Sequence, residues 1–390
     1  MRIITIIICS IITLEAFSQK ERDTVYTWYD DAQTMRKEVY LTVNDTKHGD
    51  YKYCYETGEL WQQGDYNNGE LNGLWKIYYK DGSIKQKINY VNGSREDLFE
   101  SYYENGQIHQ AGYYLEDKYN GIIKTYYEDG NIMEIAHYKN GQLYGMATGF
   151  FENGNLIYRR NYIDNKANGL WEYYHPNGKI KEQAIKKDDL YDSAFIGYYQ
   201  TGSLLKECKY SKGKLDGEYI GYHLNGSIMV KCLYINDKIE GEWEEYYDNK
   251  QLMEKGYYNN GKRDSLWIVY YLSGKKHIEG NYKNNLFKGV WSVYYENGNL
   301  KQIGEYSAGE AIGHWKFYHP NGNLMEEGKY EKDKKDGIWK QYYDAGELKI
   351  ITNYKNGEFH GIQKAYDLEG KVIEKRKYNK GVLKSNSNVF

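Results

Sequence analysis

The chain has 390 residues and a formal net charge of −3, with 47 tyrosines and 41 glycines but only two prolines and four cysteines. Lysine and glutamate are mixed along its length, so it lacks the basic stripe that DNA- and RNA-binding proteins show, and we expect no nucleic-acid partner. So few cysteines also exclude a disulfide-rich scaffold.

The first segment, residues 1–18, has the composition of a secretory signal peptide. Arg2 precedes an apolar run at residues 3–14, and the small residues Ala16 and Ser18 follow it. The run is shorter than the roughly 20 residues that a membrane-spanning helix needs. We therefore predict cleavage near Ser18 and export to the periplasm, the cell surface or the medium.

An array of repeats follows a degenerate leading segment. Residues 19–48 are predicted to form an N-terminal capping unit, and from Gly49 to Lys384 a 24-residue unit repeats fourteen times without insertion or deletion. Residues 385–390 remain as a C-terminal tail. A residue type that recurs in every unit is required by the unit itself and not by one reaction.

Four columns of residues define the unit when its first position is the glycine at Gly49. Glycine fills position 10 except at Lys250, an aliphatic residue fills position 12 except at Lys276, and tyrosine fills position 18 except at Lys186. Tryptophan fills position 3 in half of the units, as Trp75, Trp171, Trp243, Trp267, Trp291, Trp315 and Trp339.

Each unit contains two turn signals, such as Asn297-Gly298 and Asn356-Gly357, because Asn and Gly accept positive φ. Two turns in 24 residues predict two strands of about 6 to 8 residues each. The first turn fits either a two-residue type I′ loop or a three-residue loop with a glycine bulge. This choice decides whether position 7 or position 6 faces the aliphatic column. In both cases positions 3 and 7 share one face of the sheet.

We predict an all-β fold, an elongated single-layer antiparallel sheet of fourteen stacked β-hairpin units. A solenoid with one unit per coil is the alternative; it would span about 67 Å where stacked hairpins would span roughly 130 Å. Cys208 and Cys232 occupy position 16 of adjacent units, ~9.6 Å apart in hairpins and ~4.8 Å apart in a solenoid. A disulfide between them would favour the solenoid, whereas the turn chemistry favours hairpins.

The skeleton Gly-x-Trp-x-x-Tyr-Tyr-x-x-Gly-x-Leu, followed by Gly-x-Tyr and an Asn-Gly turn, closely resembles the variant MORN repeat over residues 49–384. Among bacterial members the chain is similar to YwqK-like proteins, which carry an antitoxin label. The resemblance implies a twisted sheet of hairpins that acts in protein-protein contact, with membrane lipid contact a further implication. Anionic lipid would require a basic face, and the array is close to neutral.

No catalytic arrangement, cofactor motif or metal site is predicted. The recurring glycines open no helix, as phosphate-binding loops require. His175, His223 and His319 all occupy position 7, but no two of them lie in adjacent units, so they cannot share a metal ion. We expect a protein that is not an enzyme and that holds no cofactor.

Three features are candidates for binding. The tryptophan column has the residue type for aromatic cages or sugar platforms, although cross-strand packing explains it more simply. A second candidate is the unit that starts at Gly145, because mixed aromatic and arginine side chains are typical of protein interfaces; its members are Phe150, Phe151, Tyr158, Arg159 and Arg160. The third is the charged segment 186–189, which replaces a tyrosine turn.

A run of basic residues lies near the end of the array. We predict that it forms a solvated terminal strand whose charge discourages edge-to-edge association. Its members are Lys375, Arg376, Lys377, Lys380 and Lys384.

These observations favour a non-enzymatic exported scaffold that binds a protein partner, such as a toxin-type domain. The alternative is a binder of cell-envelope glycan or of a choline-type ligand through the tryptophan and tyrosine columns.

Overall fold

The computed structural model describes residues 21–388, so the predicted signal segment lies outside the described part. Within residues 21–388 every regular element is a β-strand, and no helix of the length and apolarity needed to cross a membrane is found there. The prediction of an all-β hairpin fold is confirmed. The chain divides into two units, Met1–Lys166 and Ala167–Phe390, and each is described by itself.

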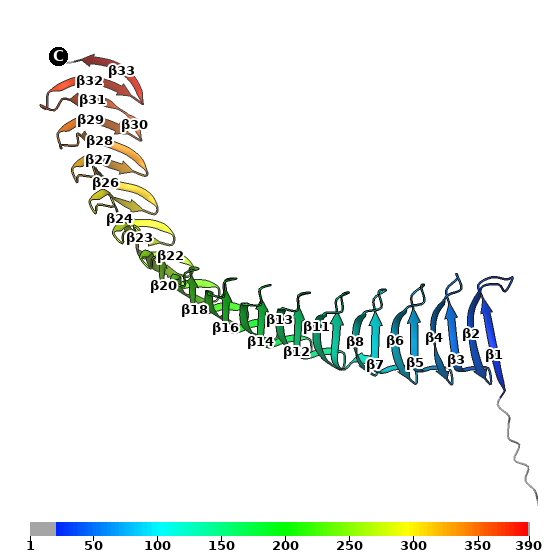
Figure 1. Cartoon of the computed structure of the whole chain (residues 1–390). Helices are drawn as coiled ribbons and strands as arrows, with labels where there is room; N and C mark the ends of the chain where they lie inside the picture. Colours follow the sequence, from blue (N-terminus) through cyan, green and yellow to red (C-terminus); the bar gives the residue numbers. More distant parts are fainter. Residues whose placement is uncertain (1–20, 389–390) are drawn as a thin grey trace, which may run out of the picture. The chain divides into compact units, whose positions relative to one another are not determined.

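In the first unit the strands lie side by side in chain order, and neighbouring strands pair antiparallel (Figure 1). They are β1 (Arg22–Trp28), β2 (Arg36–Val43), β3 (Thr46–Cys54), β4 (Leu60–Asn67), β5 (Glu70–Tyr78), β6 (Ile84–Val91), β7 (Ser94–Tyr102), β8 (Ile108–Leu115), β9 (Lys118–Tyr119), β10 (Gly121–Tyr126), β11 (Ile132–Lys139), β12 (Gln142–Phe150) and β13 (Leu156–Ile163). The short β9 and β10 both pair with β8.

The second unit repeats this order from β14, whose first residue lies at the boundary. Its strands are β14 (Lys166–Tyr174), β15 (Ile180–Lys187), β16 (Leu190–Tyr198), β17 (Leu204–Ser211), β18 (Lys214–Tyr222), β19 (Ile228–Ile235), β20 (Lys238–Tyr246), β21 (Leu252–Asn259), β22 (Lys262–Tyr270), β23 (Lys276–Lys283), β24 (Leu286–Tyr294), β25 (Leu300–Ser307), β26 (Glu310–Tyr318), β27 (Leu324–Glu331), β28 (Lys334–Tyr342), β29 (Leu348–Lys355), β30 (Glu358–Phe359), β31 (Gly361–Tyr366), β32 (Val372–Asn379) and β33 (Val382–Asn388).

The first turn of each repeat is the three-residue loop with a glycine bulge. Between β24 and β25, the Gly298 N–H donates to the Tyr295 carbonyl at 2.9 Å, and the Tyr295 N–H donates to the Asn299 carbonyl at 2.8 Å. Gly298 has φ +96°, the conformation that this bulge requires. Tyr294 consequently pairs with Leu300, so position 6 faces the aliphatic column.

The second turn is a two-residue type I′ loop. Between β23 and β24, Lys283 pairs with Leu286, and the intervening Asn284 and Asn285 have φ values of 52° and 69°. Two positive φ values in succession match the right-handed twist of the flanking strands. The two turn signals in the sequence therefore produce two different turns, one at each edge of the sheet.

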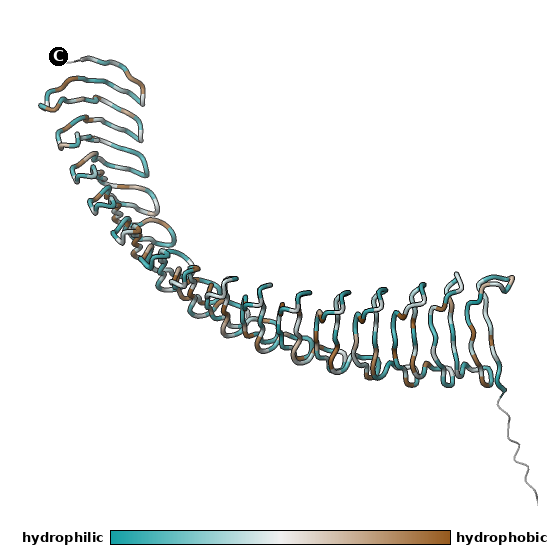
Figure 2. The backbone as a smooth tube through the Cα atoms, viewed as in Figure 1, coloured by the Kyte–Doolittle hydropathy of each residue, from teal (hydrophilic) through white to brown (hydrophobic). Residues whose placement is uncertain are grey.

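Residues paired across neighbouring strands share a face, and this divides the repeat into two sets. In the unit at Gly289, Trp291 pairs with Gly280 and Gly304, and Val293 pairs with Gln302. Positions 3, 5, 14, 16 and 18 form one side, which we call the aromatic face. Positions 2, 4, 15 and 17 form the other side, which we call the open face. Apolar positions recur in every hairpin and are not confined to one part of the chain (Figure 2).

The aromatic face is built from tryptophan rings that lie flat on glycines. A Cβ built on Gly64, Gly256, Gly280, Gly304 or Gly328 would fall inside the ring of the position 3 tryptophan on the next strand. Where position 16 carries a side chain, the residue paired with it is usually smaller: Ile88 pairs with Phe99 and Ala136 pairs with Ala147. The two positions thus share one volume, as close packing requires.

Tyrosine hydroxyls connect each unit to the next along the first-turn edge. The Tyr271 hydroxyl donates to the Tyr294 carbonyl and the Tyr295 hydroxyl donates to the Tyr318 carbonyl, at 2.7 and 2.8 Å. His223 replaces this tyrosine and places Nε2 2.8 Å from the Tyr246 carbonyl. His175 keeps the same contact at 3.2 Å from the Tyr198 carbonyl. His319 does not, because its Nδ1 lies 3.1 Å from Asp344 Oδ1 and its buried Nε2 makes no hydrogen bond to the described residues.

The positions of the two cysteines agree with stacked hairpins and not with a solenoid. Cys208 and Cys232 both pair with Tyr219, which lies on the strand between them, and both are free thiols. Two strand spacings of ~4.8 Å separate them, beyond the reach of a disulfide.

The basic run extends over the last two strands of the described residues and the turn between them, and of its members Lys384 lies in the final strand β33. Lys375, Arg376 and Lys377 lie in β32, which pairs with β31 on one side and with β33 on the other. Strand β33 continues to Asn388, so the predicted tail begins inside a strand. The sequence predicts a tail there because residues 385–388 contain no aromatic or aliphatic residue that marks a strand.

Candidate functional site

The tryptophan column packs within the aromatic face. The exposed fraction is 9% or less for Trp75, Trp171, Trp267, Trp291, Trp315 and Trp339, and Trp243 is half-buried. Tyrosines at position 18 meet these rings edge-to-face: the centroids of Tyr306 and Trp315 are 5.1 Å apart with an interplanar angle of 90°. Such pairs contribute roughly 0.5 to 1.5 kcal/mol each, so cross-strand packing accounts for the column.

In some repeats a basic side chain of the chain lies against these rings, in an arrangement that we call a cation cradle. Lys335 Nζ lies 3.8 Å from the Trp339 ring centroid and 5.5 Å from that of Tyr354, and it is 2.6 Å from Glu326 Oε1. Position 23 supplies the cation and position 14 of the same repeat supplies the carboxylate.

The same cradle recurs in both units of the chain. Arg263 lies 4.1 Å from the centroid of Trp267 and contacts Glu254 at 3.1 Å. Burial raises the pKa of Glu254, and the charge of Arg263 opposes that rise. In the first unit Lys47 lies 4.7 Å from the centroid of Tyr51. An external cation at Trp267 or Trp339 would have to displace these side chains. Before Trp75, Trp243, Trp291 and Trp315, position 23 is instead apolar: Leu71, Ile239, Phe287 and Ala311.

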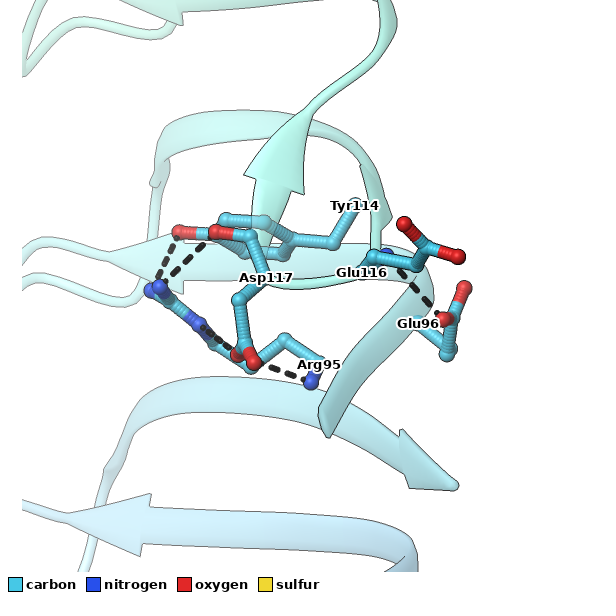
Figure 3. A network of polar contacts seen from close by, with 5 residues as sticks. All are labelled: Arg95, Glu96, Tyr114, Glu116 and Asp117. Atoms are coloured by element: carbon cyan, nitrogen blue, oxygen red, sulfur yellow. Dashed lines mark hydrogen bonds and ion pairs between the residues drawn. The ribbon is translucent and has the colours of Figure 1, made fainter. Parts of the chain in front are cut away.

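Arg95 occupies the same position in a repeat whose position 14 is Gln86, and its guanidinium group turns to the next turn instead (Figure 3). Its Nε lies 3.0 Å from Asp117 Oδ1, and Nη1 donates to the Tyr114 hydroxyl at 3.1 Å. The backbone N–H and side chain of Arg95 lower the pKa of Asp117. This network joins two successive turns and is structural.

The predicted patch in the unit at Gly145 is split between the two faces. The Tyr158 ring lies against Gly149, its hydroxyl donates to Glu134, and the Arg160 guanidinium carbon is 3.7 Å from its centroid. These residues belong to the aromatic face.

The other members of that patch lie elsewhere. Arg159 is exposed on the open face opposite Thr148, Phe150 pairs with Leu156, and Phe151 lies in the first turn. The structure therefore brings together Tyr158 and Arg160 but not the five predicted residues.

Lys186, the exception in the tyrosine column, also places a cation between two aromatic rings, but from position 18 and not from position 23. Its Nζ lies 4.5 Å from the ring centroids of both Trp171 and Tyr191. Asp189, in the same charged segment, accepts a hydrogen bond from the Ala167 N–H at 2.7 Å. Lys186 thus packs against aromatic rings, and Asp189 stabilises the second turn.

The surface available to a partner is the open face, which sequence reasoning missed. Position 2 carries exposed aliphatic side chains in many units, among them Leu74, Leu98, Ile122, Val290 and Ile338. Position 2 precedes the buried tryptophan, so alternation alone places it on the other side of the sheet. Apolar side chains on an exposed sheet face mark interaction sites when they are contiguous.

Tyrosines at position 6 border this face and bind carboxylates. The Tyr222 hydroxyl donates to Glu207 at 2.7 Å and that of Tyr342 donates to Glu327 at 2.8 Å. Burial, together with these hydrogen bonds to carboxylates, raises the pKa of Tyr222 and of Tyr342 to about 12. Within residues 21–388, no three His, Cys, Asp or Glu side chains gather closely enough to hold a metal ion.

The sequence matches a family model described as MORN repeat variant in thirteen segments that together cover more than half of the chain. The segments are 47–68, 71–92, 98–116, 119–140, 143–164, 167–185, 215–236, 239–260, 263–284, 288–308, 312–332, 335–356 and 359–380. A comparison with curated protein sequences finds no match.

Among solved structures, the crystal structure of TcdB2-TccC3-Cdc42 aligns at 10% identity and a TM-score of 0.16, covering 92% of this chain and 25% of that chain. A Tc holotoxin pore of Photorhabdus luminescens aligns at 10% identity and a TM-score of 0.13, covering 92% and 26%. The chain spans about a quarter of the length of these proteins. Scores this low establish no shared function.

Proposed function

Because the chain belongs to the MORN repeat variant family, we propose that it is a non-enzymatic repeat scaffold that binds a protein partner on its open face. One observation carries the proposal: the aromatic face is filled by the chain's own tryptophans, tyrosines and cations, whereas the open face leaves aliphatic side chains exposed in unit after unit. A repeat array offers such a surface over many units.

The proposal extends to place and partner. The signal-like composition of residues 1–18 supports export with cleavage near Ser18. The resemblance to antitoxin-labelled chains supports a partner of toxin type. Intact mass of the protein recovered from exporting cells tests the first point, with a mature chain that starts at residue 19 as the expected result.

Affinity capture tests the central claim. The mature chain is immobilised and exposed to an envelope extract of its source, and retained proteins are identified by mass spectrometry. We expect one protein that, once purified, binds the chain at 1:1 stoichiometry in calorimetry. Retention of glycan without any protein would contradict the scaffold and favour the tryptophan column as a binding site.

A further inference from the structure

An uninterrupted row of aliphatic side chains lies on the open face of the first unit. Leu74, Leu98, Ile122 and Met146 occupy position 2 of four successive repeats, and each is 42 to 48% exposed. We call these four residues the aliphatic row. Successive members are two strand spacings apart, ~9.6 Å. Tyr113 pairs with Leu98 and widens the row.

Aliphatic residues also occupy position 2 in the second unit, but there they are interrupted. Those exposed at this position are Leu170, Leu266, Val290, Ile338 and Ile362. In the second unit, position 2 is alanine or glutamate in three successive repeats, Ala194, Glu218 and Glu242. Packing of the repeat therefore does not demand an aliphatic residue there. A half-exposed aliphatic side chain in four repeats in succession is instead what a contact surface needs.

A row of basic residues runs beside the aliphatic row, at positions 4 and 15. Lys76 pairs directly with Lys87 across β5 and β6, a like-charge pairing that disfavours the sheet. Glu100 forms an ion pair with Lys87, with 3.1 Å between Lys87 Nζ and Glu100 Oε2, and it accepts a hydrogen bond from the Tyr102 hydroxyl. Lys124 follows on β10, paired with Ala111 and Ile135.

The positive charge of this row is not cancelled by the acids of the same face. Arg159 is exposed on β13, and Lys124 is exposed as well. Asp50 and Asp65 pair with each other beyond Leu74, at one end of the aliphatic row. The row is thus bordered along one side by Lys76, Lys124 and Arg159, none of which forms an ion pair within residues 21–388.

We propose that the aliphatic row binds an acidic peptide segment of a partner protein, and this inference rests on the proposed scaffold function. Aliphatic side chains of the segment would cover the row, and its carboxylates would meet Lys76, Lys124 and Arg159. A polypeptide fits better than a lipid surface, because the row is narrow, widened only where Tyr113 lies beside Leu98, and lies in mid-strand. Side chains that enter a bilayer must project from the surface, and these are half-buried.

Selection from a library of random 16-residue peptides, displayed on phage and applied to the immobilised full chain, tests this proposal. We expect enrichment of peptides that combine aliphatic and acidic residues. For a synthetic enriched peptide, we expect at least a tenfold loss of affinity with Leu98→Asp/Ile122→Asp. Lys76→Glu/Lys124→Glu should lose as much and should also reduce the salt dependence of binding.

The matched control is Val290→Asp/Ile338→Asp, which places the same charges at position 2 of the second unit, where the side chains are 55 and 58% exposed. This variant should bind the peptide as the unaltered chain does. Circular dichroism of all three variants checks that they fold. Equal losses in the two Asp variants, or enriched peptides without acidic residues, would overturn the proposal.

Binding to phosphatidylserine vesicles tests whether the row contacts a lipid surface instead. Vesicle binding that Leu98→Asp/Ile122→Asp abolishes, without any peptide enrichment, would assign the row to a lipid surface. A captured natural partner that binds Leu98→Asp/Ile122→Asp with unchanged affinity would overturn this inference and leave the scaffold function intact. If neither a captured partner nor an enriched peptide is found, the result would count against the scaffold function and against this inference.

Discussion

At the scale of single residues, stability depends on pairs of positions that share one volume. Glycine at position 16 is not needed for its backbone freedom in these pairs, because Gly304 and Gly328 have no positive φ. It is needed because the tryptophan ring of the next strand occupies the space of a Cβ.

The Gly304→Ala substitution should therefore lower stability by overpacking, by about 1 to 3 kcal/mol. The cost should be smaller when Trp315→Phe is already present, because a smaller ring leaves room for the methyl group, as Phe99 does for Ile88. Urea unfolding midpoints of the two single variants and the double variant measure this coupling. Equal costs in both backgrounds would show that the two residues do not share a volume.

A histidine should make stability depend on pH. His277 stacks on Tyr271 with centroids 4.2 Å apart, and burial, together with the charge of Lys301, lowers its pKa. In the unfolded chain the imidazole titrates near pKa ~6.5. The unfolded state therefore takes up the proton first as pH falls below that value, and the contribution of His277 to stability is lost there.

His277→Phe should keep the stacking and remove this titration. We expect its unfolding temperature to fall less than that of the unaltered chain between pH 7.5 and pH 5.5, both measured by circular dichroism. An identical pH profile for the two proteins would show that His277 does not contribute.

At the scale of the element, the hairpin is defined by its two turns and by the contacts that each turn makes with the next. The second turn accepts either glycine or an Asn or Asp whose side chain binds the preceding repeat. Asn285 Oδ1 accepts the Arg263 N–H at 2.7 Å in this way.

Gly261 has φ +77° and only the Lys238 side chain nearby, at 3.8 Å. Gly261→Asn should hold stability within about 0.5 kcal/mol, because Asn tolerates this conformation and gains a hydrogen bond. Gly261→Val should cost about 1 to 3 kcal/mol, because a β-branched residue is strained there. The pair is compared by urea unfolding, and a tolerated valine would contradict the turn assignment.

The cation cradle couples neighbouring strands through a partly buried charge pair. The side chains of Lys335 and Glu326 are 23% and 16% exposed. Lys335→Ala removes the cation and leaves Glu326 Oε1 with the neutral donor Gln341 Nε2 at 3.1 Å. The substitution should cost more than about 1 kcal/mol, the scale of a charged hydrogen bond lost on burial. Adding Glu326→Gln should recover part of that loss in thermal unfolding. No recovery would mean that stacking on Trp339, and not the charge pair, supplies the stability.

At the scale of the whole molecule, each repeat contacts only its neighbours, so the array should tolerate loss of a complete repeat. Deletion of residues 289–312 joins Lys288 to Gly313 in register, and the far-UV spectrum per residue should stay the same. Deletion of residues 289–300 should disrupt the surrounding strands, because it removes one strand and one turn. Circular dichroism and limited proteolysis distinguish the two variants, and equal damage would contradict nearest-neighbour stability.

Much of the fold was predictable because its determinants are local. The Asn-Gly turns, the aliphatic column and the 24-residue period predict strands and hairpins from short segments, and these were confirmed. The site was less predictable. Tyr158, Arg159 and Phe150 are close in the sequence, yet alternation and the first turn place them on different faces.

The sequence by itself determined the repeat, the number of strands per repeat and the chemistry of the turns, since each depends on residues a few positions apart. Tertiary structure alone decided the type of the first turn, the burial of the tryptophans and the occupancy of the cradles by Lys335 and Arg263. The physical reason is that burial in a single sheet depends on side chains from the adjacent strands, such as Gly304 and Tyr306 against Trp315, and therefore on how the strands pair. The exposure of the row from Leu74 to Met146 also depends on the tertiary structure, because the described strands form a single sheet and no second layer covers the open face.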